Sequence, residues 1–336
     1  MPKNIVVGID GTWNAANHQS GGQTNISDLL SWVSPQGQTK AYFNGVGSGQ
    51  LPLGRVFYGI SGRGVFNLAR CAWGFVHQNF QAGDRIFIFG FSRGAFAARH
   101  LASMIVRRGI RGWQGDLEDE FRKWLLEMRH PCTMVQQQVH MLGLFDCVPA
   151  NQLYVLRDRS SYLNAGHLEP GIDHVRHAVA IHERRWSYRP IIFERPEDRD
   201  IRQHWFPGCH SDVGGGRDCA SGLAAFSLWW MLREAHGVGL DLNHVVCPQH
   251  PHGAALNVIQ AVDTREAPKR SDWITTRLGW ALDRQNMPEA SLVDGTPEFL
   301  DLDVCYRCQH EMYDALSTPD AQRRLTTMGF GTGSAR

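Results

Sequence analysis

A serine between two glycines, in the sequence Gly90-Phe91-Ser92-Arg93-Gly94, matches the pattern G-x-S-x-G. This pattern is typical of a strained turn between a strand and a helix, which presents the serine hydroxyl as a nucleophile. An apolar run at residues 85–90 precedes the serine, and small and apolar residues at helical spacing follow from Ala95 onward. The sequence therefore predicts Ser92 as a nucleophile. The alternative is an ordinary serine in a turn bounded by glycines.

A serine nucleophile needs a base, and the base needs an acidic partner that orients it. In α/β-hydrolases these residues occur in the chain order Ser, then Asp or Glu, then His. Asp146 directly follows an apolar run, and His210 opens a glycine-rich segment that we expect to be a loop able to reach Ser92. Asp212 is the alternative acid, although its side chain can instead bond the backbone of its own loop. We predict Ser92, Asp146 and His210 as catalytic residues, with Asp212 as a supporting residue.

The segment Asp10-Gly11-Thr12 follows the first apolar run of the chain, residues 5–9. Our candidates for an oxyanion hole are the Arg93 N–H and a backbone N–H of Gly11 or Thr12, and Asp10 is a candidate supporting residue. The same Asp-Gly-Thr sequence resembles phosphoaspartyl hydrolases of the haloacid dehalogenase type. Those enzymes use an aspartate two residues earlier, where this chain has Gly8. A magnesium-dependent reaction through Asp10 is therefore an alternative in spite of that missing residue.

The elements that must position these residues alternate between strand and helix patterns. We expect strands at or near residues 5–9, 41–43, 85–90, 140–145 and 204–206. We expect helices within residues 54–80, from Ala95 to Gly109, and over residues 116–128, 174–185 and 223–236. This alternation predicts an α/β fold of the α/β-hydrolase type, a mostly parallel sheet with helices on both faces. Active sites of such sheets lie at the carboxyl ends of the strands, where the candidates above are found.

Composition excludes some classes of function. The 336 residues carry 34 basic and 33 acidic side chains, a net charge of +1, which gives no electrostatic reason to expect nucleic-acid binding. We see neither a signal-peptide pattern nor an apolar stretch long enough to cross a bilayer, so we expect a cytoplasmic protein with no classical export signal. We expect the eight cysteines to be buried thiols rather than disulfides.

The pattern weakens after residue 240. We expect residues 1–240 to form the catalytic domain and residues 241–336 to form a C-terminal extension, which caps the site or closes the same domain. Cysteine and histidine at zinc-like spacing occur in two segments of the extension, around Cys247 and between Cys305 and Cys308. Because nothing shows that these segments meet, we expect ordinary loops, with no metal and no other cofactor. Apolar residues of the extension form either core or a membrane-contacting face: Trp273, Ile274, Leu278, Trp280 and Leu282.

Five motifs occur in one order: Asp10-Gly11-Thr12-Trp13-Asn14, Gly45-Val46-Gly47, Gly90-Phe91-Ser92-Arg93-Gly94-Ala95, Phe145-Asp146, and the run from Trp205 to Gly216. This combination resembles the DUF2235 family of α/β-hydrolases, which includes the catalytic domain of phospholipase effectors of the type VI secretion system. The resemblance spans residues 5–239. It implies a triad of Ser92, Asp146 and His210, ester hydrolysis with phospholipids as substrates, and peripheral membrane contact. It also implies export by a type VI system without a signal peptide, with a secretion-system or immunity protein as partner.

Two further interpretations stay open. One is a small-molecule esterase or thioesterase with no membrane role. The other is a non-catalytic binding protein built on a hydrolase fold, against which the presence of Ser92, Asp146 and His210 argues.

Overall fold

The computed structural model describes residues 2–11, 23–45, 63–112, 116–149, 166–180, 183, 188–194, 196–206, 209–216 and 223–243. Nearly all of the expected C-terminal extension, with Cys247, Cys305, Cys308 and the apolar residues 273–282, lies outside these residues, and so does Thr12.

In the described part of the chain, six strands form one sheet in which every neighbouring pair is parallel. The order across the sheet is β2 (Gln38–Phe43), β1 (Asn4–Ile9), β3 (Arg85–Phe91), β4 (Val139–Phe145), β5 (Ile172–Ala180) and β6 (Asp200–Phe206). The register pairs Ile9 with Gly90, and Phe91 with Phe145. The residues that follow β1, β3 and β4 therefore meet at one edge of the sheet.

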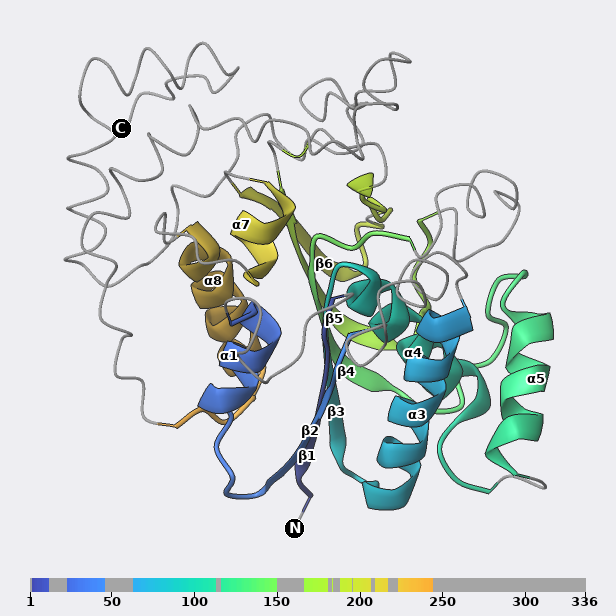
Figure 1. Cartoon of the computed structure of the whole chain (residues 1–336). Helices are drawn as coiled ribbons and strands as arrows, with labels where there is room; N and C mark the ends of the chain where they lie inside the picture. Colours follow the sequence, from blue (N-terminus) through green and yellow to red (C-terminus); the bar gives the residue numbers. More distant parts are fainter. Residues whose placement is uncertain are drawn as a thin grey trace, which may run out of the picture.

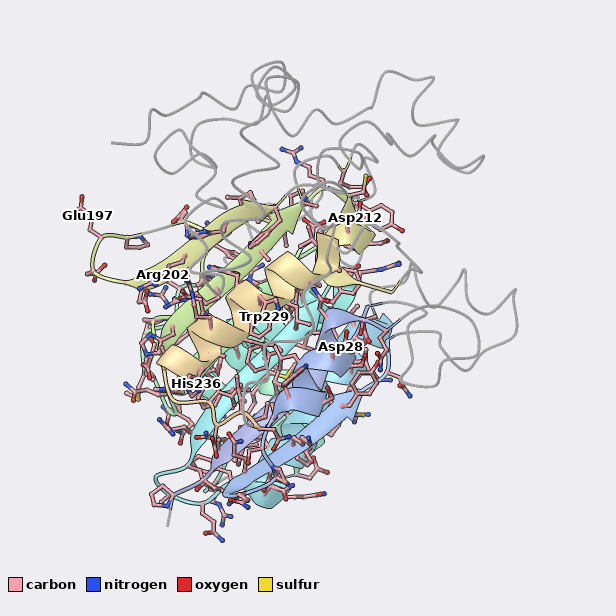
Figure 2. The ribbon with its side chains drawn as sticks, turned by 90° about the vertical axis from the view of Figure 1, so that its left-hand side faces the viewer. Asp28, Glu197, Arg202, Asp212, Trp229 and His236 are labelled. Carbon is pink, nitrogen blue, oxygen red and sulfur yellow. The ribbon has the colours of Figure 1, made fainter. Side chains whose placement is uncertain are left out.

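Helices cover both faces of this sheet, as Figure 1 shows. One face carries α3 (Arg63–Asn79), α4 (Arg93–Arg108) and α5 (Leu117–Glu127). The other carries α1 (Asn25–Trp32) and α8 (Leu223–Gly237), which lie side by side in Figure 2. Figure 1 places the short helix α7 (His210–Gly214) above α8, beside the upper end of the sheet. The prediction of an α/β-hydrolase-like fold is thus confirmed.

Each central strand supplies side chains to two separate cores. In β1, Val7 packs under α3 and α4, whereas Val6 packs under α1 and α8. In β3, Ile88 packs in the same core as Val7, and Phe89 packs in the same core as Val6. Because successive side chains of a strand point to opposite faces, a strand buried on both sides is apolar throughout. This is why the strands β1, β3 and β4 could be predicted from continuous apolar runs.

One expected helix is wrong. The sequence pattern predicts a helix over residues 174–185, but Ile172–Ala180 is strand β5, between β4 and β6. Its buried polar side chains are satisfied by distant residues. The Arg176 guanidinium bonds to Asp200 at 2.7 Å and also to Glu234 of α8. A polar sequence can therefore form a strand inside this sheet, which an apolar run would not have indicated.

Two helices have no counterpart among the predicted elements. Helix α1 begins after Thr24, whose hydroxyl accepts the Ser27 N–H at 3.3 Å as an N-cap. It packs closely on β1, because a Cβ at Gly8 would lie 2.6 Å from the end of Leu30. Helix α7 replaces the loop expected at His210. Both are short, and both are stabilised by tertiary contacts rather than by their own length.

Candidate active site

Ser92 stands at the junction of β3 and α4 with backbone angles φ 59° and ψ −126°. The flanking glycines permit this turn. A Cβ at Gly90 would lie 2.6 Å from the Ala95 Cα, and one at Gly94 would lie 2.3 Å from the Asp10 carbonyl oxygen. Because backbone atoms cannot yield at those distances, side chains are excluded at both positions. The G-x-S-x-G sequence thus forms the strained strand-to-helix turn that it predicts.

His210 lies between Ser92 and Asp146. Its Nε2 is 2.7 Å from the Ser92 Oγ, and its Nδ1 is 2.6 Å from the Asp146 Oδ2. All three residues are buried, with 4% or less of each exposed. The structure therefore brings together residues that are 64 and 118 positions apart in the chain.

The backbone of β5 orients Asp146. Its Oδ1 accepts the Ala180 N–H at 3.0 Å, and its own N–H donates to the Ala178 carbonyl at 2.7 Å. The carboxylate acts as an acceptor, so the facing Nδ1 of His210 carries the hydrogen. The Nε2 is then left with a lone pair, which accepts the Ser92 hydroxyl. This is the tautomer in which a histidine can remove a proton from serine.

Asp212 has a different place. It is the third residue of α7, and its Oδ2 accepts the Cys209 N–H at 2.7 Å, which closes a capping box at the start of that helix. Figure 2 shows Asp212 at the end of the molecule where α7 lies. Of the two candidate acids, Asp146 is the one at the His210 Nδ1.

Three neighbours of His210 have no counterpart among the predicted site residues. The Glu183 Oε2 accepts the His210 backbone N–H at 3.3 Å, and Glu183 is only 2% exposed. The Tyr188 ring meets the His210 ring edge-on at 4.7 Å between centroids, and Phe91 packs against His210 at the same separation. Glu183 is a carboxylate three residues beyond the end of β5, whereas Asp146 directly follows β4. The helix wrongly expected over residues 174–185 hid this signal.

The candidate oxyanion donors are not equivalent in this structure. The Arg93 N–H belongs to the first turn of α4, before the first intrahelical bond, which runs from the Phe96 N–H to the Ser92 carbonyl. The Gly11 N–H instead donates to the Asp10 Oδ1 at 2.6 Å. Partial burial lowers the pKa of the Arg93 guanidinium. The first turn of α4 is thus the better supported half of an oxyanion hole.

Asp10 is buried in a network of its own. Its Oδ2 accepts the Thr24 hydroxyl at 2.5 Å and also the Tyr42 hydroxyl. Burial, reinforced by the Asp10 charge and this hydrogen bond, raises the pKa of Tyr42 well above its usual value. Across the described ranges, no group of three or more His, Cys, Asp or Glu side chains is placed to hold a metal ion. No helix among those residues is long and apolar enough to cross a membrane.

The parallel sheet, the strained turn at Ser92 and the Ser92–His210–Asp146 contacts define a protein of the α/β-hydrolase class. A family model described as the catalytic domain of Tle1-like phospholipase effectors of the type VI secretion system matches residues 3–130 and 116–234. These matches span more than half of the chain, and the chain belongs to this family. The expected resemblance to type VI phospholipase effectors is thereby confirmed.

Individual relatives are more distant. An uncharacterized protein of Saccharomyces cerevisiae, YEL023C, is 34% identical over 143 residues, which cover 36% of this chain and 20% of the yeast protein. The Tle1 effector solved bound to the VgrG spike of the type VI secretion system is 20% identical, with a TM-score of 0.41, over 65% of this chain and 52% of that one. An uncharacterized protein from Pseudomonas aeruginosa is 17% identical, with a TM-score of 0.44, over 98% of this chain and 62% of that one. The chain thus matches less than two thirds of the length of each of these proteins.

Proposed function

We propose that this chain is a serine esterase that cleaves carboxylic esters of lipids, phospholipids above all, through an acyl-enzyme. The observation that carries the proposal is the position of His210, within hydrogen-bond distance of both the Ser92 Oγ and the Asp146 carboxylate. Membership of a family of phospholipase effector domains supports the lipid substrate.

In the proposed reaction, the Ser92 Oγ attacks the ester carbonyl while the His210 Nε2 takes the serine proton. Asp146 stabilises the imidazolium that results, and the Arg93 N–H donates to the oxyanion. The carbon–oxygen bond to the alcohol then breaks, and His210 returns its proton to the leaving oxygen. Water, activated by the same histidine, attacks the acyl-enzyme and releases the carboxylic acid and free Ser92.

A second oxyanion donor belongs, in this proposal, to the segment after β1. The Gly11 N–H can serve as this donor only after its hydrogen bond to the Asp10 carboxylate is broken. The Thr12 N–H is the other candidate in the same segment.

Family membership also supports delivery by a type VI secretion system, with a secretion-system protein as partner and peripheral contact with a membrane. The catalytic domain is assigned to residues 1–240. The family match ends at residue 234, and Leu242 still pairs with Val33 of the domain.

The decisive experiment measures fatty-acid release from phosphatidylcholine–phosphatidylglycerol vesicles, beside hydrolysis of short p-nitrophenyl esters. Wild type is compared with Ser92→Ala and with Ser31→Ala, a matched control on the exposed side of α1. We expect Ser92→Ala to lower turnover by about 10³-fold or more, while Ser31→Ala behaves as wild type.

The substrates separate the alternatives. Release from vesicles that depends on Ser92 supports the lipid esterase. Activity on short esters alone would contradict the lipid substrate and favour a small-molecule esterase. If wild type hydrolysed neither substrate and left fluorophosphonate probes unreacted, the chain would be a binding protein on a hydrolase fold.

A further inference from the structure

Buried polar residues connect the end of β1 to helix α1. Asp10 and Thr24 are 1% and 3% exposed, and the Thr24 hydroxyl donates to the Asp10 carboxylate at 2.5 Å. Thr24 is also the N-cap of α1. The Asp10 carbonyl lies against Gly94, directly behind the turn that carries Ser92. The start of α1 is therefore fixed relative to the Ser92 turn.

The next residue connects α1 to the helix that carries His210. The Asn25 amide donates to the Val213 carbonyl of α7 at 2.9 Å, to the Ala224 carbonyl of α8 at 2.8 Å, and to the Ser227 hydroxyl at 3.1 Å. Asn25 is 2% exposed, and Ser227 is fully buried. Thr24 also pairs with Gly215, the C-cap that follows α7. Helix α7 is thus held at its C-terminal end by α1, together with Ser227 of α8, whose hydroxyl donates to the Val213 carbonyl at 2.6 Å.

The dimensions of α7 make this support necessary. It has five residues, too few to be stable alone, and His210 is the first of them. The C-terminal end of α7 is tightly packed, since a Cβ at Gly214 would lie 1.9 Å from the Phe91 ring. A displacement of Val213 therefore also moves His210, because both residues belong to the same short helix. A shift of about 1 Å in a reacting group can cost about 10²-fold in rate.

We propose that Asp10, Thr24 and Asn25, the α1 strap, are positioning residues that hold His210 at hydrogen-bond distance from Ser92. The strap connects the two sides of the site, the Ser92 turn and α7, through one helix cap. In this proposal the strap acts through the Ser92 turn and α7 rather than on the reacting atoms. This inference rests on the proposed function, since it assigns the strap to the reaction of Ser92.

Two substitutions separate positioning from general stability. Thr24→Val removes the hydroxyl with little change of shape, whereas Thr24→Ser keeps the hydroxyl and should restore the wild-type rate. Asn25→Asp replaces the amide donor with an acceptor that faces the Val213 and Ala224 carbonyls. Because Asn25 is buried, this carboxylate also costs stability, so the melting temperature of Asn25→Asp is measured and the rates are compared on the folded protein. Ser31→Ala, on the same helix and exposed, is the matched control.

Two rates report the Ser92–His210 pair. One is kcat on p-nitrophenyl esters. The other is the rate at which a fluorophosphonate probe forms a phosphorus–oxygen bond with Ser92 and loses fluoride, which needs no ester turnover. Both are measured well below each variant's melting temperature. We expect Thr24→Val and Asn25→Asp to lower both rates about tenfold or more, with KM little changed, because misplacement of a catalytic group slows the chemical step.

The outcomes separate the strap from the proposed function. If Thr24→Val and Asn25→Asp fold and react with the probe as fast as wild type, the strap is structural only, and the proposed esterase stands. If wild-type Ser92 does not react with the probe, the proposed function fails and the strap fails with it. If Thr24→Val does not fold, Asn25→Asp against Ser31→Ala decides the question.

Discussion

Ser92 and Asp146 share a backbone conformation that is unusual for residues with side chains. Their φ angles are 59° and 40°, and in the described part of the chain no other non-glycine residue has a positive φ. They follow paired residues of β3 and β4, and the Ser92 N–H donates to the Phe145 carbonyl at 3.0 Å. Such strain is retained when the surrounding structure determines it, and it clusters at functional sites. Here it turns two side chains from neighbouring strands toward one imidazole.

Asp146→Asn should separate the two candidate acids. The amide can donate to the His210 Nδ1, which favours the wrong tautomer, so we expect kcat to fall about 10³- to 10⁴-fold. Asp212→Asn keeps a cap acceptor for the Cys209 N–H, and we expect its kcat to stay within about twofold of wild type. Both are measured on p-nitrophenyl esters. A larger loss for Asp212→Asn than for Asp146→Asn would reverse our assignment of the acid.

Gly94→Ala should destabilise the fold at the Ser92 turn. Its Cβ would meet the Asp10 and Ile9 carbonyl oxygens at 2.3 and 2.4 Å. Because backbone must move, we expect a loss of about 1–3 kcal/mol in the free energy of unfolding, measured by urea denaturation. Gly237→Ala is the matched control, since its Cβ would meet no heavy atom within 4 Å. We expect the control to be neutral or slightly stabilising, and equal effects of the two changes would contradict the packing at Gly94.

The sequence was sufficient where the information is local. Apolar runs predict β1, β3 and β4, and the five residues around Ser92 predict their own turn. The order of Asp146 and His210 after Ser92 predicts which residues meet. None of these predictions needs a contact between distant segments to be known in advance.

The rest depends on distant partners. Arg176 can be buried in a strand because it donates a hydrogen bond to Glu234, which is 58 residues away in the chain. Likewise, the Asn25 amide donates to the Val213 carbonyl, 188 residues away. Glu183 became recognisable only once β5 was known to end before it. Buried polar residues carry little local signal, since their partners decide whether they can be buried at all.

Asp10→Asn distinguishes the serine mechanism from a phosphoaspartyl mechanism. Under the proposed mechanism Asp10 positions its neighbours, so we expect Asp10→Asn to lower kcat on esters by about 10- to 10²-fold and to retain Ser92-dependent turnover. Magnesium should have no effect on either protein. Complete loss with Asp10→Asn, together with a magnesium-dependent activity that survives in Ser92→Ala, would favour the phosphoaspartyl alternative.

Acidification should destabilise the protein through His100. This side chain is fully buried in α4, and desolvation lowers its pKa from 6.5 to about 3. Between those pH values the unfolded chain binds a proton that the folded chain does not, so stability is lost as the pH falls. We expect the free energy of unfolding to fall by about 1.4 kcal/mol per pH unit because of this group.

His100→Phe keeps an aromatic ring against Phe96 and removes the titration, so its urea midpoints should fall less steeply than those of wild type between pH 6 and pH 4. Carboxylates titrate in both proteins and cancel in the comparison, and parallel curves would show that His100 is protonated without cost in the folded state.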